Sequence, residues 1–323
     1  MSTVFPTDDP PHLIYPLIHN LAMVIITGPT ASGKTGRAVD LARTLHAEIV
    51  SADSRQVYRG MDIGSGKDLD EYGEVPYHLI DIVDAGEVYN LFRFLEDARQ
   101  AIASIEARGH EAIVCGGSGM YVEALARGTS LPEVPRNEEL RLSLAGKSLE
   151  ELRGILASMK TLHNTTDTDT CARAVRAIEI QSYYAAHPEI DPTAPMKTLP
   201  SAQPLIIGVE VDRDTRRARI TRRLDERLRA GMVDEVSRLL ERGVDPQILI
   251  NYGLEYRFVT RHLLGELSEQ EMRSGLEIAI HQFAKRQMTW FRGMERRGFK
   301  IHWLPAGLTR TEFSDRVISL MRR

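Results

Sequence analysis

The chain has 323 residues, of which 42% are hydrophobic and 27% are charged, and its formal net charge is −4. This length can form one large or two medium domains with a sizeable core, which excludes a peptide or mini-protein scaffold. The sequence contains no apolar run of the roughly 18 residues that a membrane span needs, and two cysteines cannot build a disulfide framework. We therefore expect a cytoplasmic protein with no membrane partner.

The first twenty residues resemble neither a secretory signal nor a folded element. They contain four prolines, and Asp8 and Asp9 stand where a signal peptide carries basic residues. We expect residues 1–20 to form a flexible N-terminal lead.

A phosphate-binding pattern follows the first predicted strand. Residues 21–27 form a short apolar run, and residues 34–45 carry apolar side chains at helical spacing. Between them GPTASGKT, residues 28–35, fits the P-loop pattern G-x-x-x-x-G-K-[ST]. Backbone amides and the helix N-terminus would hold phosphate there, while Lys34 supplies a cation and Thr35 a hydroxyl for Mg²⁺. The loop predicts a bound di- or triphosphate, and a P-loop small-molecule kinase remains an alternative.

Further strands indicate an α/β fold. Short β-rich runs at 48–52, 77–83 and 111–115 are typical of strands that are buried on both faces of a parallel sheet. A helix is predicted over 92–107. We therefore predict a P-loop-containing parallel sheet flanked by helices, with doubly wound topology.

A helical insert is predicted to interrupt this core. Proline-bearing stretches at 129–140 and 187–200 bound it, and no strand signal appears between them. Its first helix is expected to begin at the capping box formed by Ser148 and Glu151. The predicted division is a catalytic core of residues 21–128 and 201–323, and an insert of residues 129–200.

The core is predicted to resume with a strand at 205–211, an Arg-rich helix over 213–229 and a long helix from the capping box at Ser268 to about Arg297. The Arg-rich segment holds eight Arg and three acidic residues. A cluster of Arg side chains suits a polyanion even in a net-acidic protein, and a solvated helix face is an equally good interpretation.

An Asp residue lies at or near the end of each of two predicted strands. Asp53 follows the second strand and Asp81 lies near the end of the third. Ligands of open α/β sheets bind at the carboxyl ends of the strands, so Asp53 should lie near the P-loop. Its spacing leaves three roles open, namely a Mg²⁺ ligand, a general base and the cap of a turn.

Six segments resemble the successive motifs of the tRNA dimethylallyltransferase family, also called tRNA isopentenyltransferases. In chain order they are GPTASGKT, ADSRQVYRGMDIG, VPYHLIDI, VCGGSGMYVEAL, RAVRAIEI and QFAKRQMTWFRG. The resemblance extends over about residues 21–293. The chain is also similar to adenylate isopentenyltransferases, which act on free nucleotides, although a nucleotide would not require the long insert.

The resemblance implies transfer of the dimethylallyl group of dimethylallyl diphosphate to N6 of adenosine 37, in tRNAs that read codons beginning with U. Pyrophosphate is the second product and Mg²⁺ the expected cofactor. The insert would grip the anticodon stem-loop, and the target base would be flipped out of its stack. We expect the enzyme to be a monomer.

The same resemblance assigns residues to roles. Asp53 would be the general base that accepts the amine proton, and the Thr30 hydroxyl would lie between the base and the diphosphate. The expected diphosphate-binding residues are Gly28, Pro29, Thr30, Ala31, Ser32, Gly33, Lys34, Thr35, Arg219 and Arg223. The expected tRNA-binding residues are Asp53, Ser54, Arg55, Gln56, Ser118, Arg173, Arg176, Lys285 and Arg286.

Some of these segments carry a structural alternative. Arg173 and Arg176 are equally typical of a salt-bridged helix surface. Phe283, Trp290 and Phe291 resemble base-stacking aromatics, but at helical spacing we expect them to belong to the core.

Two segments depart from the family pattern. The family commonly reads G-T-A-K after M-D-I, where this chain has Gly64 followed by Ser65-Gly66-Lys67. The usual G-Y-K-E is replaced by Tyr252-Gly253-Leu254-Glu255, which removes a basic residue at 254. We expect these departures to affect the tRNA channel and to leave the diphosphate site intact.

Overall fold

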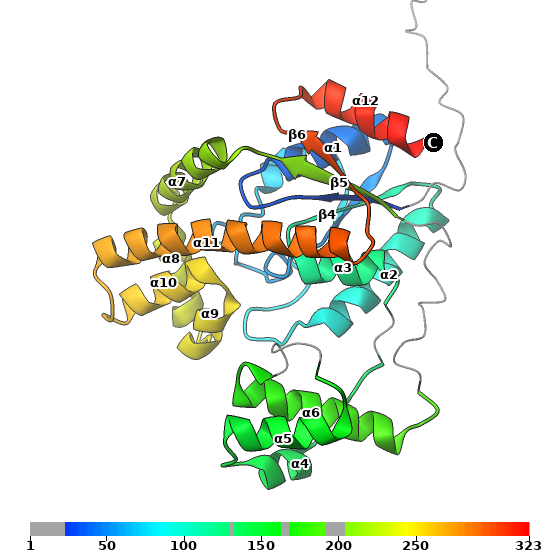
Figure 1. Cartoon of the computed structure of the whole chain (residues 1–323). Coiled ribbons are helices and arrows are strands. Elements are labelled where there is room, and N and C mark those ends of the chain that lie inside the picture. Colours follow the sequence, from blue (N-terminus) through cyan, green and yellow to red (C-terminus); the bar gives the residue numbers. More distant parts are fainter. Residues whose placement is uncertain (1–22, 130–131, 163–167, 191–203, 323) are drawn as a thin grey trace, which may run out of the picture.

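The computed structural model describes residues 23–129, 132–162, 168–190 and 204–322, so the N-terminal lead lies outside the described residues. At its centre is a parallel sheet of six strands in the order β3-β2-β4-β1-β5-β6 (Figure 1). The strands are β1 (Val24–Thr27), β2 (Glu48–Ser51), β3 (Tyr77–His78), β4 (Ala112–Gly116), β5 (Leu205–Glu210) and β6 (Ile301–Pro305).

Helices cover both faces of the sheet. On one face α1 (Lys34–Leu45) and α12 (Arg310–Met321) pack through residues such as Val39 and Phe313. On the other, α2 (Leu91–Ala107), α3 (Gly119–Ala126) and α11 (Glu269–Arg296) pack through residues such as Phe94 and Phe291. All four residues of β1 are buried, because apolar side chains are covered on both sides. The predicted P-loop α/β fold is therefore confirmed.

A second layer of helices lies beside the carboxyl ends of the strands. It comprises α7 (Arg213–Arg229), α8 (Met232–Glu241), α9 (Pro246–Tyr252), α10 (Leu254–Leu263) and part of α11. These helices share a core with the segment that follows β2, through residues such as Met61, Leu224 and Tyr256. This layer therefore encloses the segment that begins at Asp53.

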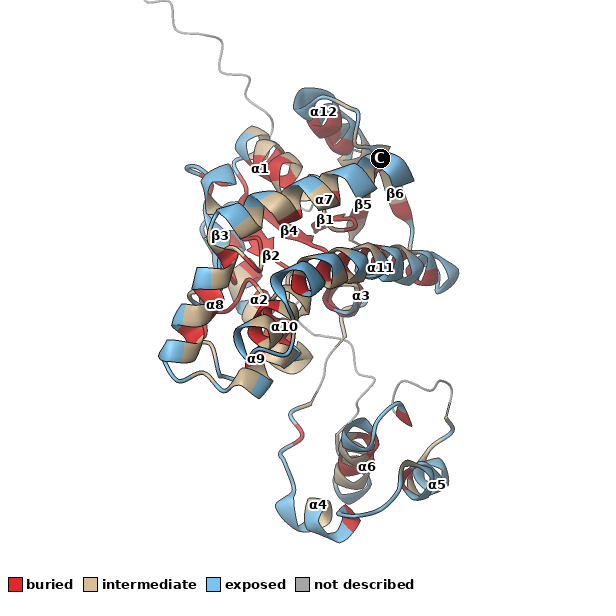
Figure 2. Cartoon of the chain, turned by 90° about the vertical axis from the view of Figure 1, so that its left-hand side faces the viewer, coloured by how far each residue is buried: buried red, intermediate tan, exposed pale blue. Residues whose placement is uncertain are grey.

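The helices α4 (Glu138–Leu144), α5 (Leu149–Met159) and α6 (Cys171–Ala186) form a separate small core, which includes Leu152, Leu156 and Ile178. Both views place this group below the sheet (Figures 1 and 2), and the ribbon colours of Figure 2 mark many of its residues as exposed. The group lies within the segment predicted to be the insert. Its α5 begins at the predicted capping box of Ser148 and Glu151.

Two predicted elements are wrong in detail. The third strand is confined to Tyr77–His78, because Leu79 and Asp81 adopt left-handed φ values of 63° and 56° that end the extended conformation. The first helix of this segment was expected at Ser148, but α4 precedes it and starts at Glu138, where the Asn137 side chain accepts a hydrogen bond from the Leu140 N–H.

Candidate active site

The P-loop joins β1 to α1, as the sequence predicted. Gly28 (φ 155°) and Gly33 (φ 77°) adopt backbone conformations that L side chains rarely take, and Gly33 is the N-cap of α1. A Cβ at Gly28 would lie 3.1 Å from the carbonyl oxygen of Val209 on β5. The loop therefore needs glycine at position 28 to stay against the sheet.

Gln287 of α11, which sequence reasoning did not select, fixes this loop. Its Oε1 accepts a hydrogen bond from the Thr30 N–H at 2.9 Å, and its Nε2 donates to the carbonyl of Gly117 at 2.8 Å. The side chain is buried. Gln287 thus connects the P-loop to the segment after β4, and nothing in its local sequence distinguishes it from the other polar residues of α11.

A cavity of about 360 Å³ opens above the P-loop. Thr30, Lys34 and Thr35 line it from the P-loop, and Asp53 lines it from the end of β2. Burial lowers the pKa of Lys34, and the negative charge of Asp53 partly offsets this effect. The cavity therefore brings together a carboxylate, a buried ammonium and two hydroxyls.

One Asp53 oxygen, Oδ1, accepts the Arg55 N–H at 3.0 Å, so the side chain also caps a turn. Beside it the Ser54 N–H donates to Ser118 Oγ at 3.1 Å, which joins the ends of β2 and β4. Ser54, Arg55 and Ser118 all line the cavity, as the resemblance implied. Arg55 also lies over the ring of Tyr252.

Gln56 is buried, and its contacts are internal. Its Oε1 accepts the Ser51 hydroxyl at 2.8 Å, and its Nε2 donates to the carbonyl of Gly66 at 3.1 Å. These bonds hold the segment after Asp53 in place. Gln56 reaches the cavity wall, but its two polar atoms already have protein partners.

A second, more open groove of about 750 Å³ lies beside the P-loop. Arg219 lines this groove, whereas Arg223 lines both the groove and the cavity. Arg227, which sequence reasoning did not select, also lines both. Because 219, 223 and 227 are spaced by four residues on α7, they form one stripe along the helix.

The remaining predicted tRNA-binding residues lie in three different settings. Arg286 lines the cavity, and Lys285 is exposed on the same helix. Arg173 forms an exposed ion pair with Asp169 in the insert. Arg176 pairs with Glu179 and donates to the carbonyl of Val134. The two insert arginines thus have structural partners and lie on a different body from the cavity.

The aromatic side chains of α11 divide between core and surface. Phe291 is buried, as expected, but Phe283 and Trp290 are 40% and 41% exposed, so the expectation of a core position is wrong for both. Phe283 lines the cavity, and the Arg286 guanidinium lies over its ring. Cys115 also lines the cavity, but burial raises the pKa of its thiol to about 12, so it stays protonated near neutral pH.

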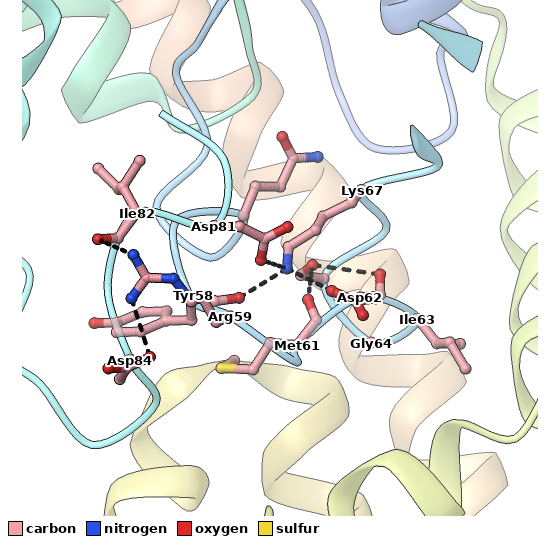
Figure 3. Close-up of polar contacts among 12 residues, drawn as sticks. Tyr58, Arg59, Met61, Asp62, Ile63, Gly64, Lys67, Asp81, Ile82 and Asp84 are labelled. Carbon is pink, nitrogen blue, oxygen red and sulfur yellow. Dashed lines mark hydrogen bonds and ion pairs between the residues drawn. The ribbon is translucent and has the colours of Figure 1, made fainter. Parts of the chain in front are cut away.

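An ion-pair cluster around the buried Lys67 supports the segment that follows Asp53 (Figure 3). Lys67 is 1% exposed, and its ammonium donates to Asp62 Oδ1 at 2.5 Å, to Asp81 Oδ1 and to the carbonyl of Tyr58 at 2.7 Å. Asp81, the carboxylate near the end of the predicted third strand, is therefore paired with Lys67. The same segment is anchored from α8, where Glu235 accepts three successive backbone N–H groups, those of residues 62–64.

We expect Lys67→Met to lower the free energy of unfolding by about 2–4 kcal/mol, because it leaves two carboxylates and a buried carbonyl without their cation. Arg59→Met is the matched control in the same segment, since Arg59 pairs with Asp84 at an exposed site and should contribute about 0–1 kcal/mol. Urea denaturation of both variants measures the difference. Equal losses would contradict a supporting role for the cluster.

The donor set of the cavity suits Mg²⁺. This ion prefers oxygen ligands and retains several waters beside substrate phosphates. The Thr35 hydroxyl and the Asp53 carboxylate line one cavity, and the Ser32 hydroxyl beneath the P-loop is buried with no partner among the residues that the structure describes. The residues present therefore fit a cation that is shared with a bound diphosphate.

Within the described ranges, no helix combines the length and the apolar character needed to cross a membrane.

Comparisons with known proteins identify the family to which the chain is similar. The profile of the IPP transferase family matches residues 56–294, and an isopentenyl transferase profile matches residues 21–75. A protein named tRNA dimethylallyltransferase 2, from Bacteroides fragilis, is 55% identical over 294 residues, which cover 90% of this chain and 94% of that protein. Another, tRNA dimethylallyltransferase 1 from Geotalea daltonii, is 54% identical over 87% of this chain and 90% of its own length.

Solved structures show the same fold. The tRNA isopentenylpyrophosphate transferase of Bacillus halodurans superposes with a TM-score of 0.68 at 29% identity, covering 93% of this chain and 97% of that one. A eukaryotic dimethylallyltransferase acting on tRNA has a TM-score of 0.71 at 21% identity, covering 88% of this chain and 73% of its own.

Proposed function

The chain belongs to the IPP transferase family, and from this premise we propose that its cavity transfers a dimethylallyl group from dimethylallyl diphosphate to N6 of adenosine 37 in tRNAs that read codons beginning with U. The observation that carries the proposal is the position of Asp53 in the same cavity as the P-loop residues Thr30, Lys34 and Thr35. A carboxylate that can accept a proton in the same cavity as the P-loop residues supports this reaction.

In the reaction the adenine N6 attacks the first carbon of the dimethylallyl group. The bond from that carbon to the diphosphate oxygen breaks, and its electron pair leaves with pyrophosphate. The amine of adenine is a weak nucleophile because its lone pair is delocalised into the ring, so removal of its proton assists the attack. We assign this proton to the Asp53 carboxylate, with the Thr30 hydroxyl between base and diphosphate.

The protein stabilises the charge of the leaving group. The Lys34 ammonium at the P-loop and the guanidinium groups of Arg219 and Arg223 line the groove and cavity where pyrophosphate would form. Mg²⁺, when bound at Thr35, would supply additional positive charge to the diphosphate. The apolar side chains of Leu254, Ile280 and Phe283 line the same cavity and suit the five-carbon dimethylallyl group.

A second part of the proposal concerns the insert. Residues 129–200, whose helices α4–α6 have their own core, would hold the anticodon stem-loop while the target base enters the cavity. Arg173, Arg176, Lys285 and Arg286 are the proposed phosphate contacts. We also propose that the enzyme acts as a monomer in the cytoplasm.

Glu179 gives a way to test the insert separately. Burial alone would raise the pKa of this carboxyl, but hydrogen bonds from Arg141, the Asn137 N–H and Arg176 hold it at about 2. Because the pKa is depressed on folding, its stabilisation is present above the unfolded value of about 4.3 and is lost as the pH falls toward about 2.

We expect Glu179→Gln to lower the stability of the insert by about 3–5 kcal/mol, since the partnering arginines lose a buried charge. The affinity for tRNA should then fall at least about tenfold, while binding of pyrophosphate is unchanged. Glu150→Gln, at an exposed position of α5, removes the same charge and should alter neither property. Equal tRNA affinity in a variant with a melted insert would exclude the insert from RNA binding.

The acceptor distinguishes the proposal from its nearest alternative, an adenylate isopentenyltransferase. We would supply Mg²⁺ and labelled dimethylallyl diphosphate with three acceptors, namely an unmodified tRNA that reads a codon beginning with U, the same tRNA with guanosine at position 37, and AMP. Label in the first acceptor alone supports the proposal. Label in AMP would identify the protein as an adenylate isopentenyltransferase instead.

A further inference from the structure

Arg227 stands on the wall that separates the cavity from the groove. Its side chain is 14% exposed, and with Lys34 and Arg223 it lines both spaces. Burial and the neighbouring Arg223 both lower the pKa of its guanidinium. Two guanidinium groups and an ammonium thus share a confined region beside the P-loop, where an anion would relieve their mutual repulsion.

The backbone at Gly66 makes this arrangement possible. Gly66 has φ +67°, and a Cβ built on it would overlap the guanidinium of Arg227 and approach Nη2 of Arg223 to 2.8 Å. Both guanidinium groups therefore lie directly against the segment that follows Asp53. Any side chain at position 66 would displace Arg227 from the wall.

The carboxylate opposite Arg227 belongs to Glu255. The nearest atoms, Arg227 Nη1 and Glu255 Oε1, are 3.8 Å apart, which is longer than a hydrogen bond. Burial raises the pKa of Glu255, so this carboxyl is a weak counter-ion. By contrast, Arg223 forms a close ion pair with Asp68. Arg227 is therefore the less firmly paired of the two guanidinium groups and retains capacity to bind an anion.

We propose that Arg227 binds the diphosphate of the substrate and replaces the positive charge that position 254 lacks, with Gly66 providing the space. The two departures from the family pattern, Gly66 and Leu254, thereby have one explanation. Gly66 admits the guanidinium, and Leu254 leaves an apolar side chain in the cavity wall next to Glu255. This inference rests on the proposed function, because it concerns the substrate of the same site.

The first test compares Arg227→Met with Arg229→Met, which removes the same charge from an exposed position of the same helix. Inorganic pyrophosphate is the probe, measured by direct titration and as an inhibitor competing with dimethylallyl diphosphate. Loss of one charge-assisted contact should weaken pyrophosphate binding and raise the KM for dimethylallyl diphosphate roughly 10- to 100-fold. The KM for tRNA should stay within about twofold of wild type, and Arg229→Met should change neither KM.

The second test uses the neighbouring positions. In the Arg227→Met background, Leu254→Lys should restore at least part of the pyrophosphate affinity. Gly66→Ala should weaken pyrophosphate binding in the wild-type background, and should weaken it less once Arg227 is Met, because only Arg223 is then displaced. Circular dichroism and thermal denaturation confirm that each variant is folded.

Unchanged pyrophosphate affinity in folded Arg227→Met would overturn the inference, while prenyl transfer by the wild-type enzyme would leave the proposed function intact. If Leu254→Lys did not restore pyrophosphate binding to Arg227→Met, the idea that Arg227 replaces a positive charge at position 254 would be wrong. Conversely, a wild-type enzyme that binds pyrophosphate through Arg227 but transfers no dimethylallyl group would refute the proposed function alone.

Discussion

Asp53→Asn is expected to lower kcat for prenyl transfer roughly 10²- to 10⁴-fold, the usual contribution of a general base. Asn keeps an Oδ1 that can accept the Arg55 N–H, so the turn at the end of β2 should survive. The amide cannot take the proton of the adenine amine. The KM for dimethylallyl diphosphate should remain within a few-fold, because the P-loop is unaltered.

Single-turnover kinetics with saturating tRNA measure this effect without interference from product release. Asp84→Asn is the matched control, since Asp84 lies in an exposed ion pair with Arg59 and lines neither cavity nor groove. Activity of Asp53→Asn within a few-fold of wild type, with the fold intact, would restrict Asp53 to capping its turn.

The second large effect is expected for Lys34→Met, which should lower kcat/KM roughly 10²- to 10³-fold by removing one preorganised positive group from the leaving pyrophosphate. The free enzyme should not lose stability. Burial lowers the pKa of Lys34, which means that its charge is unfavourable in the folded state, and a neutral side chain of similar length avoids this penalty.

The pair of measurements, kcat/KM and Tm, separates a functional from a structural lysine. Lys67→Met provides the contrast. Lys67 pairs with two carboxylates in the folded protein, so its replacement is expected to lower Tm. A Lys34→Met enzyme that was destabilised as much as Lys67→Met would contradict the assignment of Lys34 to the bound diphosphate.

The sequence was sufficient for the parts of the site that depend on local pattern. The P-loop spacing and the apolar periodicity of α1 predicted Lys34–Leu45 to the residue, and the strand before Asp53 predicted its place beside the P-loop. Strands buried in a parallel sheet are nearly continuous apolar runs, so they were recognisable without any tertiary information. The short length of β3 was not recognisable from the sequence, because the left-handed conformations of Leu79 and Asp81 leave no periodic pattern.

The parts that were missed depend on contacts across long stretches of chain. Gln287 reaches Thr30 and Gly117, which are 257 and 170 residues away in sequence. Arg227 shares a helical stripe with Arg219 and Arg223, but only the packing of α7 against Gly66 shows that it enters the wall of the cavity. A charge count along the helix cannot distinguish such a residue from a solvated one.

We propose that one cavity, built from the P-loop and the end of β2, transfers a dimethylallyl group to tRNA. The most direct measurement incubates the enzyme with Mg²⁺, unmodified tRNA and labelled dimethylallyl diphosphate, with a parallel reaction that contains ATP instead. We expect labelled tRNA and an equal amount of pyrophosphate in the first reaction, and no turnover of ATP in the second. Turnover of ATP without labelled tRNA would contradict prenyl transfer and would make the protein a P-loop phosphotransferase.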